Sequence, residues 1–373
     1  MKVLHINCNY IGTTLHQLMV EELGRNGHEN VVYVPTYNSK LAVITPNDNV
    51  IVSECFRKWD RLLFDYKQSK IIRDLEEKVD VSSFDLIHAY TVFTDGNCAR
   101  NMSKKYNIPY VVTVRNTDVN SFFKKMIHLR GRGIEIMRDA KAIFFLSEAY
   151  KKQVFEKYVP KKFYNELWEK SYIVPNGIDD FWFDNKPEQC ERALTGPIKL
   201  IYAGRIDKNK NIPTTQRAMD ILVERGYDVT LTVVGRIEDK TEFEAVSKDK
   251  RTTCLPPMKK EELIEAYRSS DIFVMPSFTE SFGLVYVEAM SQGLPVVYSE
   301  GQGFDGQFEE GKVGYHANSR SATSVADAIE KIIQNYAFIS SVVVEKSRKF
   351  NWSEIVKSYH KIYCSINDLE YVH

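Results

Sequence analysis

The fold is decided by PSFTESFGLVYVEAMSQGLP, residues 276–295. The apolar run before it, 271–275, predicts a buried strand that ends at the proline, because proline lacks the backbone donor that would continue a strand. Apolar residues at helical spacing then predict a helix that begins near Gly283 and ends at Gly293. A second apolar run follows this glycine and predicts another strand. The order strand, loop, helix, strand is one βαβ unit.

The loop of this unit carries candidate chemistry. A helix that begins near Gly283 points unpaired N–H groups and its positive dipole end at the crevice where open α/β sheets bind ligands. Glu280 precedes the helix, and Glu288 lies eight residues later. Carboxylates accept hydrogen bonds from paired hydroxyls, so a sugar or a ribose suits them better than an anion does. The competing interpretation is that Glu288 is a solvated helix residue.

Length and composition limit the possible classes of protein. The chain has 373 residues, more than the roughly 250 to 300 at which one core stops growing, and this predicts two domains. Its 50 basic residues match its 50 acidic ones, which argues against nucleic acid as a partner. Six scattered cysteines without a C-x2-C pair favour reduced thiols and a cytoplasmic location. We find no apolar run of about 18 residues and therefore expect no membrane-spanning helix.

The rest of the chain repeats the alternation of strand and helix. A dense turn signal, PNGID at 175–179, separates two halves that each alternate apolar runs with amphipathic segments. The first loop contains Gly12 alone, so it lacks a dinucleotide fingerprint, and this argues against NAD. Residues 56–78 are expected to form a long amphipathic segment. The predicted strands are 2–7, 31–34, 86–89, 110–114, 142–146 and 172–174 in the first half and 198–203, 229–234, 271–275 and 296–298 in the second.

A second candidate site lies in the loop after the predicted strand 198–203. Gly204 and Arg205 follow this strand directly, and Lys210 comes five residues further on. A guanidinium can bind a diphosphate through two hydrogen bonds, and an ammonium neutralises it as a point charge. The competing interpretation is a solvated charged loop.

Taken together, these pieces resemble the family 4 retaining glycosyltransferases of the GT-B fold. The resemblance implies two Rossmann-like doubly wound α/β domains facing a central cleft. Residues 1–179 would bind the acceptor, residues 180–350 would bind the nucleotide-sugar donor, and a helix in 351–373 would pack back on the first domain. The matching pieces are PNGID at 175–179, AGR at 203–205 with Lys210, VG at 234–235, and ESFGL at 280–284 with Glu288.

The resemblance also implies roles for individual residues. Arg205 and Lys210 would bind the donor diphosphate and stabilise the leaving group, while Glu280 would contact hydroxyls of the donor sugar. We expect these three residues to be catalytic. No metal and no cofactor is expected, because two cations do the work of a magnesium ion. The further residues expected at the donor are Gly12, Gly204, Phe282, Gly283, Leu284, Arg115, Asp118 and, at the ribose, Glu288.

The first half departs from the family at one turn. Members commonly carry His-Gly-x-Asp after a strand, and here Arg115-Asn116-Thr117-Asp118 follows the predicted strand 110–114. Asp118 matches, but Arg115 is a permanent cation and cannot act as a base. Either the position contacts the donor differently or the enzyme is impaired, and we expect an altered but active site.

The expected reaction is retaining transfer of a sugar from a nucleotide-diphosphate sugar, with UDP favoured over GDP. The acceptor would be a hydroxyl of a saccharide or of a lipid-linked saccharide in cell-surface polysaccharide synthesis. A GT-B sugar-nucleotide epimerase and a donor-binding pseudoenzyme are the alternatives. Residues 122–132 and 56–59 combine aromatic and basic side chains, which suggests peripheral contact with the inner face of a membrane. The alternative for both segments is an aromatic core face with a solvated basic face.

Overall fold

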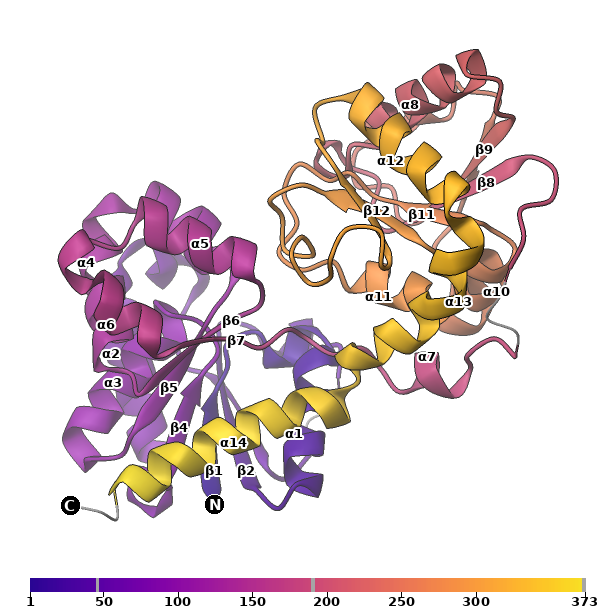
Figure 1. Ribbon diagram of the computed structural model, residues 1–373. Coiled ribbons are helices and arrows are strands. Elements are labelled where there is room, and N and C mark those ends of the chain that lie inside the picture. Colours follow the sequence, from indigo (N-terminus) through magenta and orange to yellow (C-terminus); the bar gives the residue numbers. More distant parts are fainter. Residues whose placement is uncertain (45–46, 189–191, 371–373) are drawn as a thin grey trace. The chain divides into compact units, whose positions relative to one another are not determined.

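The computed structural model describes residues 1–44, 47–188 and 192–370. These residues divide into two compact units, and each unit is built on one parallel β-sheet (Figure 1). The first unit comprises residues 1–146 and 150–177 together with the C-terminal segment that begins at Trp352. The second unit comprises residues 147–149 and 178–351. The long C-terminal helix therefore belongs to the first unit, although it follows the second in sequence.

The first sheet has seven strands in the order β3-β2-β1-β4-β5-β6-β7, and its neighbouring strands are parallel. The strand order reverses between β1 and β4, which is where open α/β sheets bind their ligands. The strands are β1 Lys2–Ile6, β2 Glu29–Thr36, β3 Val50–Glu54, β4 Leu86–Ala89, β5 Tyr110–Val114, β6 Ala142–Phe145 and β7 Ser171–Ile173.

Helices cover both faces of this sheet, because alternate strand residues enter two separate cores. Leu4 and Val112 pack on one face with helices α2 to α6, whereas Val3 and Val111 pack on the other with α1 and α14. Burial on both sides explains why these strands are mostly apolar. The helices are α1 Leu15–Arg25, α2 Phe64–Lys78, α3 Thr94–Tyr106, α4 Arg130–Asp139, α5 Glu148–Lys157, α6 Tyr164–Glu169 and α14 Trp352–Glu370.

The second sheet has six parallel strands in the order β10-β9-β8-β11-β12-β13. Within this unit α8 packs against α12, and α11 packs against α13. The strands are β8 Ile198–Ala203, β9 Val229–Val234, β10 Thr252–Leu255, β11 Ile272–Val274, β12 Val296–Ser299 and β13 Gly314–Ala317. The helices are α7 Phe181–Asp184, α8 Ile212–Glu224, α9 Lys240–Val246, α10 Lys260–Arg268, α11 Leu284–Ser291, α12 Ala322–Gln334 and α13 Tyr336–Ser347.

The structure confirms the βαβ unit around residues 276–295 as β11, α11 and β12. Within the amphipathic segment 56–78, Leu63 leaves the helical conformation (φ −114°, ψ 88°) and separates a 3₁₀ turn, Lys58–Leu62, from α2. The strands β3, β10 and β13, each at an edge of its sheet, were not predicted. Among the described residues, no helix is both long and apolar enough to cross a membrane.

Candidate active site

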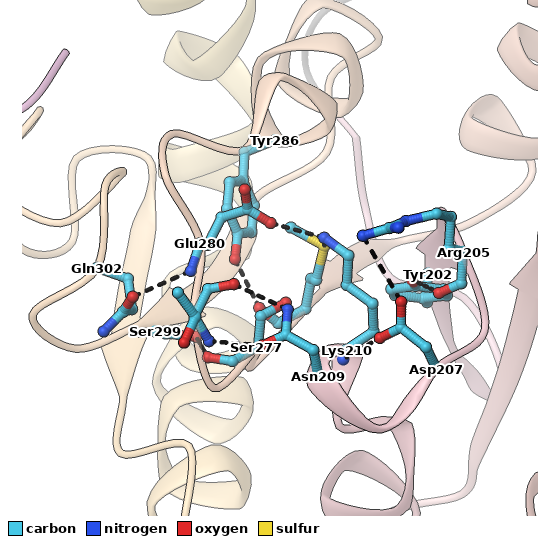
Figure 2. Close-up of polar contacts among 12 residues, drawn as sticks. Tyr202, Arg205, Asp207, Asn209, Lys210, Ser277, Glu280, Tyr286, Ser299 and Gln302 are labelled. Carbon is cyan, nitrogen blue, oxygen red and sulfur yellow. Dashed lines mark hydrogen bonds and ion pairs between the residues drawn. The ribbon is translucent and has the colours of Figure 1, made fainter. Parts of the chain in front are cut away.

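The candidate site of the second unit lies where β8 and β11 end. These two strands are parallel neighbours, with Ile201 opposite Phe273, so the loops that follow them leave the same edge of the sheet. Figure 2 shows the polar side chains of the two loops side by side, with Lys210 from one loop pointing at Glu280 from the other.

Lys210 and Glu280 form an ion pair at this edge. The Lys210 Nζ atom lies 2.6 Å from the Glu280 Oε2 atom, and the two side chains are only 14% and 13% exposed. Such short contacts between charged groups are stronger than neutral hydrogen bonds. An ammonium has three donors and a carboxylate about four acceptor positions, so each group can bind a ligand atom in addition to its partner. The structure thus brings together two of the three predicted catalytic residues.

Lys210 is held in place by the residues around it. The Asp207 side chain caps the 3₁₀ turn 208–210 by accepting a hydrogen bond from the Lys210 backbone N–H at 3.1 Å. Asn211 follows in the left-handed conformation (φ 58°), which is uncommon for a residue with a side chain. Its amide donates to the carbonyl oxygens of Pro276 (2.8 Å) and Ser319 (2.6 Å), and these bonds fix the unusual turn.

Glu280 is positioned by two amide side chains that lie outside the predicted site. Asn209 donates to the Thr279 carbonyl at 2.9 Å and accepts from the Thr279 N–H at 3.1 Å. Gln302 accepts a hydrogen bond from the Glu280 N–H at 3.0 Å (Figure 2). Asn209 has a turn-type local signal, since asparagine is common in turns, but nothing local marks Gln302.

The turn after Glu280 depends on a glycine. Gly283 has φ 82°, and a Cβ atom there would lie 2.5 Å from a ring carbon of Tyr286. Phe282 is buried against Phe350, with ring centroids 5.4 Å apart. Leu284 is the first residue of α11. The first N–H groups of a helix have no acceptor within the helix, so this turn presents backbone donors beside the ion pair, as predicted.

Arg205 and Gly204 occupy the end of β8. A Cβ atom on Gly235 would overlap the Gly204 carbonyl oxygen, so the neighbouring strand ends approach too closely for a side chain. The Arg205 side chain is 59% exposed, and its Nη2 atom lies 3.6 Å from the Asp207 Oδ2 atom. An exposed pair at this distance holds the guanidinium only weakly. Arg205 is therefore at the predicted edge with its side chain largely free to rearrange.

Glu288 is half-buried on α11. Burial raises the pKa of its carboxyl to about 7, and the nearby Lys260 ammonium opposes this increase. Lys260 itself forms an ion pair with Asp179. The sequence reasoning missed Lys260 because it lies at the start of α10, outside the motifs that identify the family.

In the first unit, Gly12 ends a short 3₁₀ turn that follows β1, Tyr10–Gly12. No atom of the described residues lies within 4 Å of the position that a Cβ atom would take on this glycine. A ligand could therefore approach the backbone at Gly12.

Arg115 and Asp118 lie in the turn after β5. The Arg115 Nη1 atom donates to the Asn176 side chain at 2.9 Å, while its Nε and Nη2 atoms are buried without a hydrogen-bond partner among the described residues. Burial lowers the pKa of Arg115.

Asp118 accepts hydrogen bonds from the N–H groups of Arg115 (2.9 Å), Val92 (3.0 Å) and Phe93 (3.3 Å), and burial raises its pKa to about 6. These bonds let Asp118 fix the turn after β5, and the expectation that it also contacts the donor remains a prediction.

One group of potential metal ligands is present in the part of the chain that the structure describes. Asp305, Glu310 and His316 bring their ligand atoms within 4.8 Å of one another. The His316 Nδ1 atom lies 3.3 Å from an oxygen of each carboxylate, which is an ordinary ion-pair arrangement. The expectation of a metal-independent reaction therefore remains a prediction.

Family comparisons agree with this geometry. A model of the Glycosyltransferase Family 4 matches residues 13–180, and a model of Glycosyl transferases group 1 matches residues 185–350. The chain is 29% identical over 216 residues to D-inositol 3-phosphate glycosyltransferase of Pseudarthrobacter chlorophenolicus, covering 53% of this chain and 51% of that protein. It is 25% identical over 235 residues to the capsular polysaccharide biosynthesis glycosyltransferase CapM of Staphylococcus aureus, covering 58% and 61%. The chain thus spans about half the length of the first of these curated relatives.

A solved structure extends the likeness to the whole fold. HepE of Anabaena, in a structure with UDP and glucose, superposes with a TM-score of 0.69 at 17% identity, covering 98% of this chain and 100% of HepE. The two parallel sheets and the two family models lead to the same conclusion. The chain belongs to glycosyltransferase family 4, of the group 1 type, and has the two-domain α/β GT-B fold.

Proposed function

We propose that this protein is a retaining glycosyltransferase that works in the cytoplasm. Its donor is a nucleotide-diphosphate sugar, with UDP favoured over GDP, and its acceptor is a hydroxyl of a saccharide or lipid-linked saccharide in cell-surface polysaccharide synthesis. The observation that carries the proposal is the Lys210–Glu280 ion pair at the carboxyl edge of the second sheet. The presence of UDP in the HepE structure supports the choice of nucleotide, and the capsular role named for CapM supports the choice of pathway class.

In the proposed reaction, the bond between the anomeric carbon of the sugar and the donor phosphate oxygen breaks. Negative charge grows on the departing diphosphate, and Arg205 and Lys210 stabilise it. Preorganised charges of this kind act most strongly where water is largely excluded, and Lys210 is only 14% exposed. Glu280 keeps the sugar in place by accepting hydrogen bonds from its hydroxyls.

The acceptor hydroxyl attacks the anomeric carbon on the face that the diphosphate leaves. Its proton passes to the departing phosphate oxygen, so the configuration is retained and no protein base is required. Arg115 in place of the family histidine is compatible with this step. Its Nε and Nη2 atoms, which have no hydrogen-bond partner among the described residues, are available for a ligand oxygen. The reaction as proposed needs no metal ion.

The backbone and the ribose contacts complete the proposed donor site. The turn from Phe282 to Leu284 supplies N–H donors to the sugar and phosphate, and Gly12 and Gly204 let the donor approach the main chain. Glu288 would bind the ribose through its hydroxyls. A hydroxyl that donates to the ionised carboxylate favours that form, so donor binding should lower the raised pKa of Glu288.

The test begins with binding and ends with products. Thermal unfolding with UDP, GDP and their sugars should show the largest shift for a UDP-sugar, and NMR of the product should show the donor's anomeric configuration. Turnover should be unchanged after treatment with EDTA. Formation of an epimerised nucleotide sugar without acceptor would favour the epimerase instead. Donor binding without transfer or hydrolysis across an acceptor panel would favour the pseudoenzyme, and the lack of a shift with every nucleotide would refute the proposed site.

A further inference from the structure

Exposed apolar side chains are concentrated in two short segments of the first unit. Of the twelve large hydrophobic side chains that are exposed in the described residues, six lie between positions 59 and 66 or at positions 126 and 127. Trp59 is 77% exposed and Leu62 is 79% exposed. Single exposed apolar residues need no explanation, but a contiguous group of them indicates a binding surface. The six residues are Trp59, Leu62, Leu63, Tyr66, Met126 and Ile127.

The two segments meet to form one surface. The ring of Phe64 lies 6.1 Å from the ring of Phe122, measured between centroids. The Arg132 guanidinium lies 5.2 Å from the Phe64 ring and also forms an ion pair with Asp65. These contacts join the start of α2 to the segment before α4. We call residues 56–66 and 122–132 together the aromatic–basic face.

The aromatic–basic face is also strongly positive. It contains seven lysines and arginines and two aspartates, a net charge of +5 in a chain whose formal net charge is zero. Asp65 is paired with Arg132, and Asp60 is paired with Lys70 at 2.7 Å. Both negative charges are therefore already neutralised by neighbouring cations. Lys58, Lys124 and Lys125 are exposed between the apolar side chains.

We propose that the aromatic–basic face docks on an anionic lipid bilayer. Trp59 and Tyr66 have the amphipathic rings that favour the headgroup layer, Leu62 and Ile127 can enter the acyl boundary, and the lysines are attracted to anionic lipid. A protein partner fits less well, because protein interfaces are depleted in lysine, whereas lysines lie throughout this face. The inference goes beyond the proposed transfer reaction, and its test requires neither donor, acceptor nor turnover.

Vesicle flotation of the full chain tests the charge component. With vesicles of phosphatidylcholine containing 30% phosphatidylglycerol, at low salt, the protein should float at least about tenfold more strongly than with phosphatidylcholine alone. Lys124→Glu/Lys125→Glu should reduce flotation by about tenfold or more. The matched control Lys248→Glu/Lys250→Glu, which changes two exposed lysines of the second unit, should float like the wild type. Equal flotation on both vesicle types, or equal loss in both variants, would overturn the proposal.

The insertion component has a built-in reporter. Among the four tryptophans, Trp59 is 77% exposed, whereas Trp182 and Trp352 are buried and Trp168 is half-buried. Phosphatidylcholine with brominated acyl chains, mixed with phosphatidylglycerol, should quench the fluorescence of the wild type. Trp59→Phe should float normally and lose this quenching. Flotation without quenching of Trp59 would show that another surface meets the lipid and would overturn the assignment.

A second pair of variants tests the apolar side chains themselves. Leu62→Ser/Ile127→Ser should reduce flotation severalfold, because fewer apolar groups leave water. Phe338→Ser, which changes a side chain of the second unit that is 54% exposed, should not reduce it. Thermal unfolding checks that each variant is folded. No flotation of the wild type on any anionic vesicle refutes the lipid partner, including the case in which the face receives a protein instead.

Discussion

Replacing Lys210 by methionine tests whether the Lys210–Glu280 ion pair serves catalysis or only stabilises the fold. Methionine keeps the apolar stem and removes the ammonium that lies 2.6 Å from the Glu280 carboxylate. If Lys210 stabilises the departing diphosphate, turnover should fall by about 10² to 10³, or about 2.7 to 4 kcal/mol of transition-state stabilisation. The substitution also leaves the Glu280 carboxylate, which is 13% exposed, without its partner.

The stability cost can be estimated from the same geometry. Breaking a fully buried ion pair costs about 3 to 5 kcal/mol, and the residual exposure of both side chains should reduce this to about 1 to 3 kcal/mol. Hydrogen exchange of the β8 and β11 amides reports the opening of the second unit alone. The double variant Lys210→Met/Glu280→Gln removes the unpaired charge, so it should regain much of the lost stability. Its turnover should stay at or below that of the single variant.

The control is Lys208→Met in the same turn. The Lys208 side chain is 76% exposed, and its Nζ atom lies 4.0 Å from the Asp239 Oδ2 atom. Turnover should therefore change by less than about threefold, and the free energy of unfolding should change by less than about 0.5 kcal/mol. Near-normal turnover in a folded Lys210→Met variant would refute the catalytic assignment. Recovery of turnover in the double variant would show that the pair only supports the fold.

Three further predictions concern other residues of the site. The pKa of Glu288 is raised from 4.5 to about 7 in the folded protein. Its contribution to stability is therefore fully present below about pH 4.5 and is lost as pH rises to about 7. In thermal unfolding, Glu288→Gln should be more stable than the wild type at pH 8 and similarly stable at pH 4. Gly283→Ala places a Cβ atom 2.5 Å from the Tyr286 ring and should cost about 1 to 3 kcal/mol, whereas Gly12→Ala meets no atom within 4 Å and should unfold like the wild type. Arg115→Ala should lower the rate of sugar transfer at least about tenfold, whereas Arg115→His should retain it. Transfer at the wild-type rate in both variants would exclude a ligand contact at this position.

Hydrophobic periodicity predicted the fold well because most strands are buried on both faces. The strand Tyr110–Val114 is apolar except for the buried Thr113, as expected for a strand between two helical layers. Three of the four edge strands, β3, β10 and β13, were missed for the opposite reason. The residues of β13, GYHA, are partly exposed and mix polar with apolar side chains, and β3 is only partly buried. A strand that is less completely buried contains fewer apolar residues, so its sequence pattern is harder to recognise.

The candidate site was predictable only where a residue follows a strand end. Lys210 and Glu280 could be identified because each lies in a loop at the carboxyl edge of the sheet, and family motifs include both. Gln302 bonds the Glu280 N–H from 22 residues away, and no local pattern can indicate such a contact. Asp118 matches the family motif by its position, but its hydrogen bonds from three backbone N–H groups could not be predicted from the sequence.

The placement of α14 has a consequence for how the protein is made. Residues 178–351 form the second unit and lie in sequence between the two parts of the first. Trp352, Tyr359 and Tyr363 of α14 pack in one core with Val3 and Leu86. During synthesis the second unit is therefore complete before the ribosome releases the helix that covers one face of the first sheet. The first unit therefore finishes folding after the second, and until then the apolar face that α14 covers is open to chaperones and to aggregation.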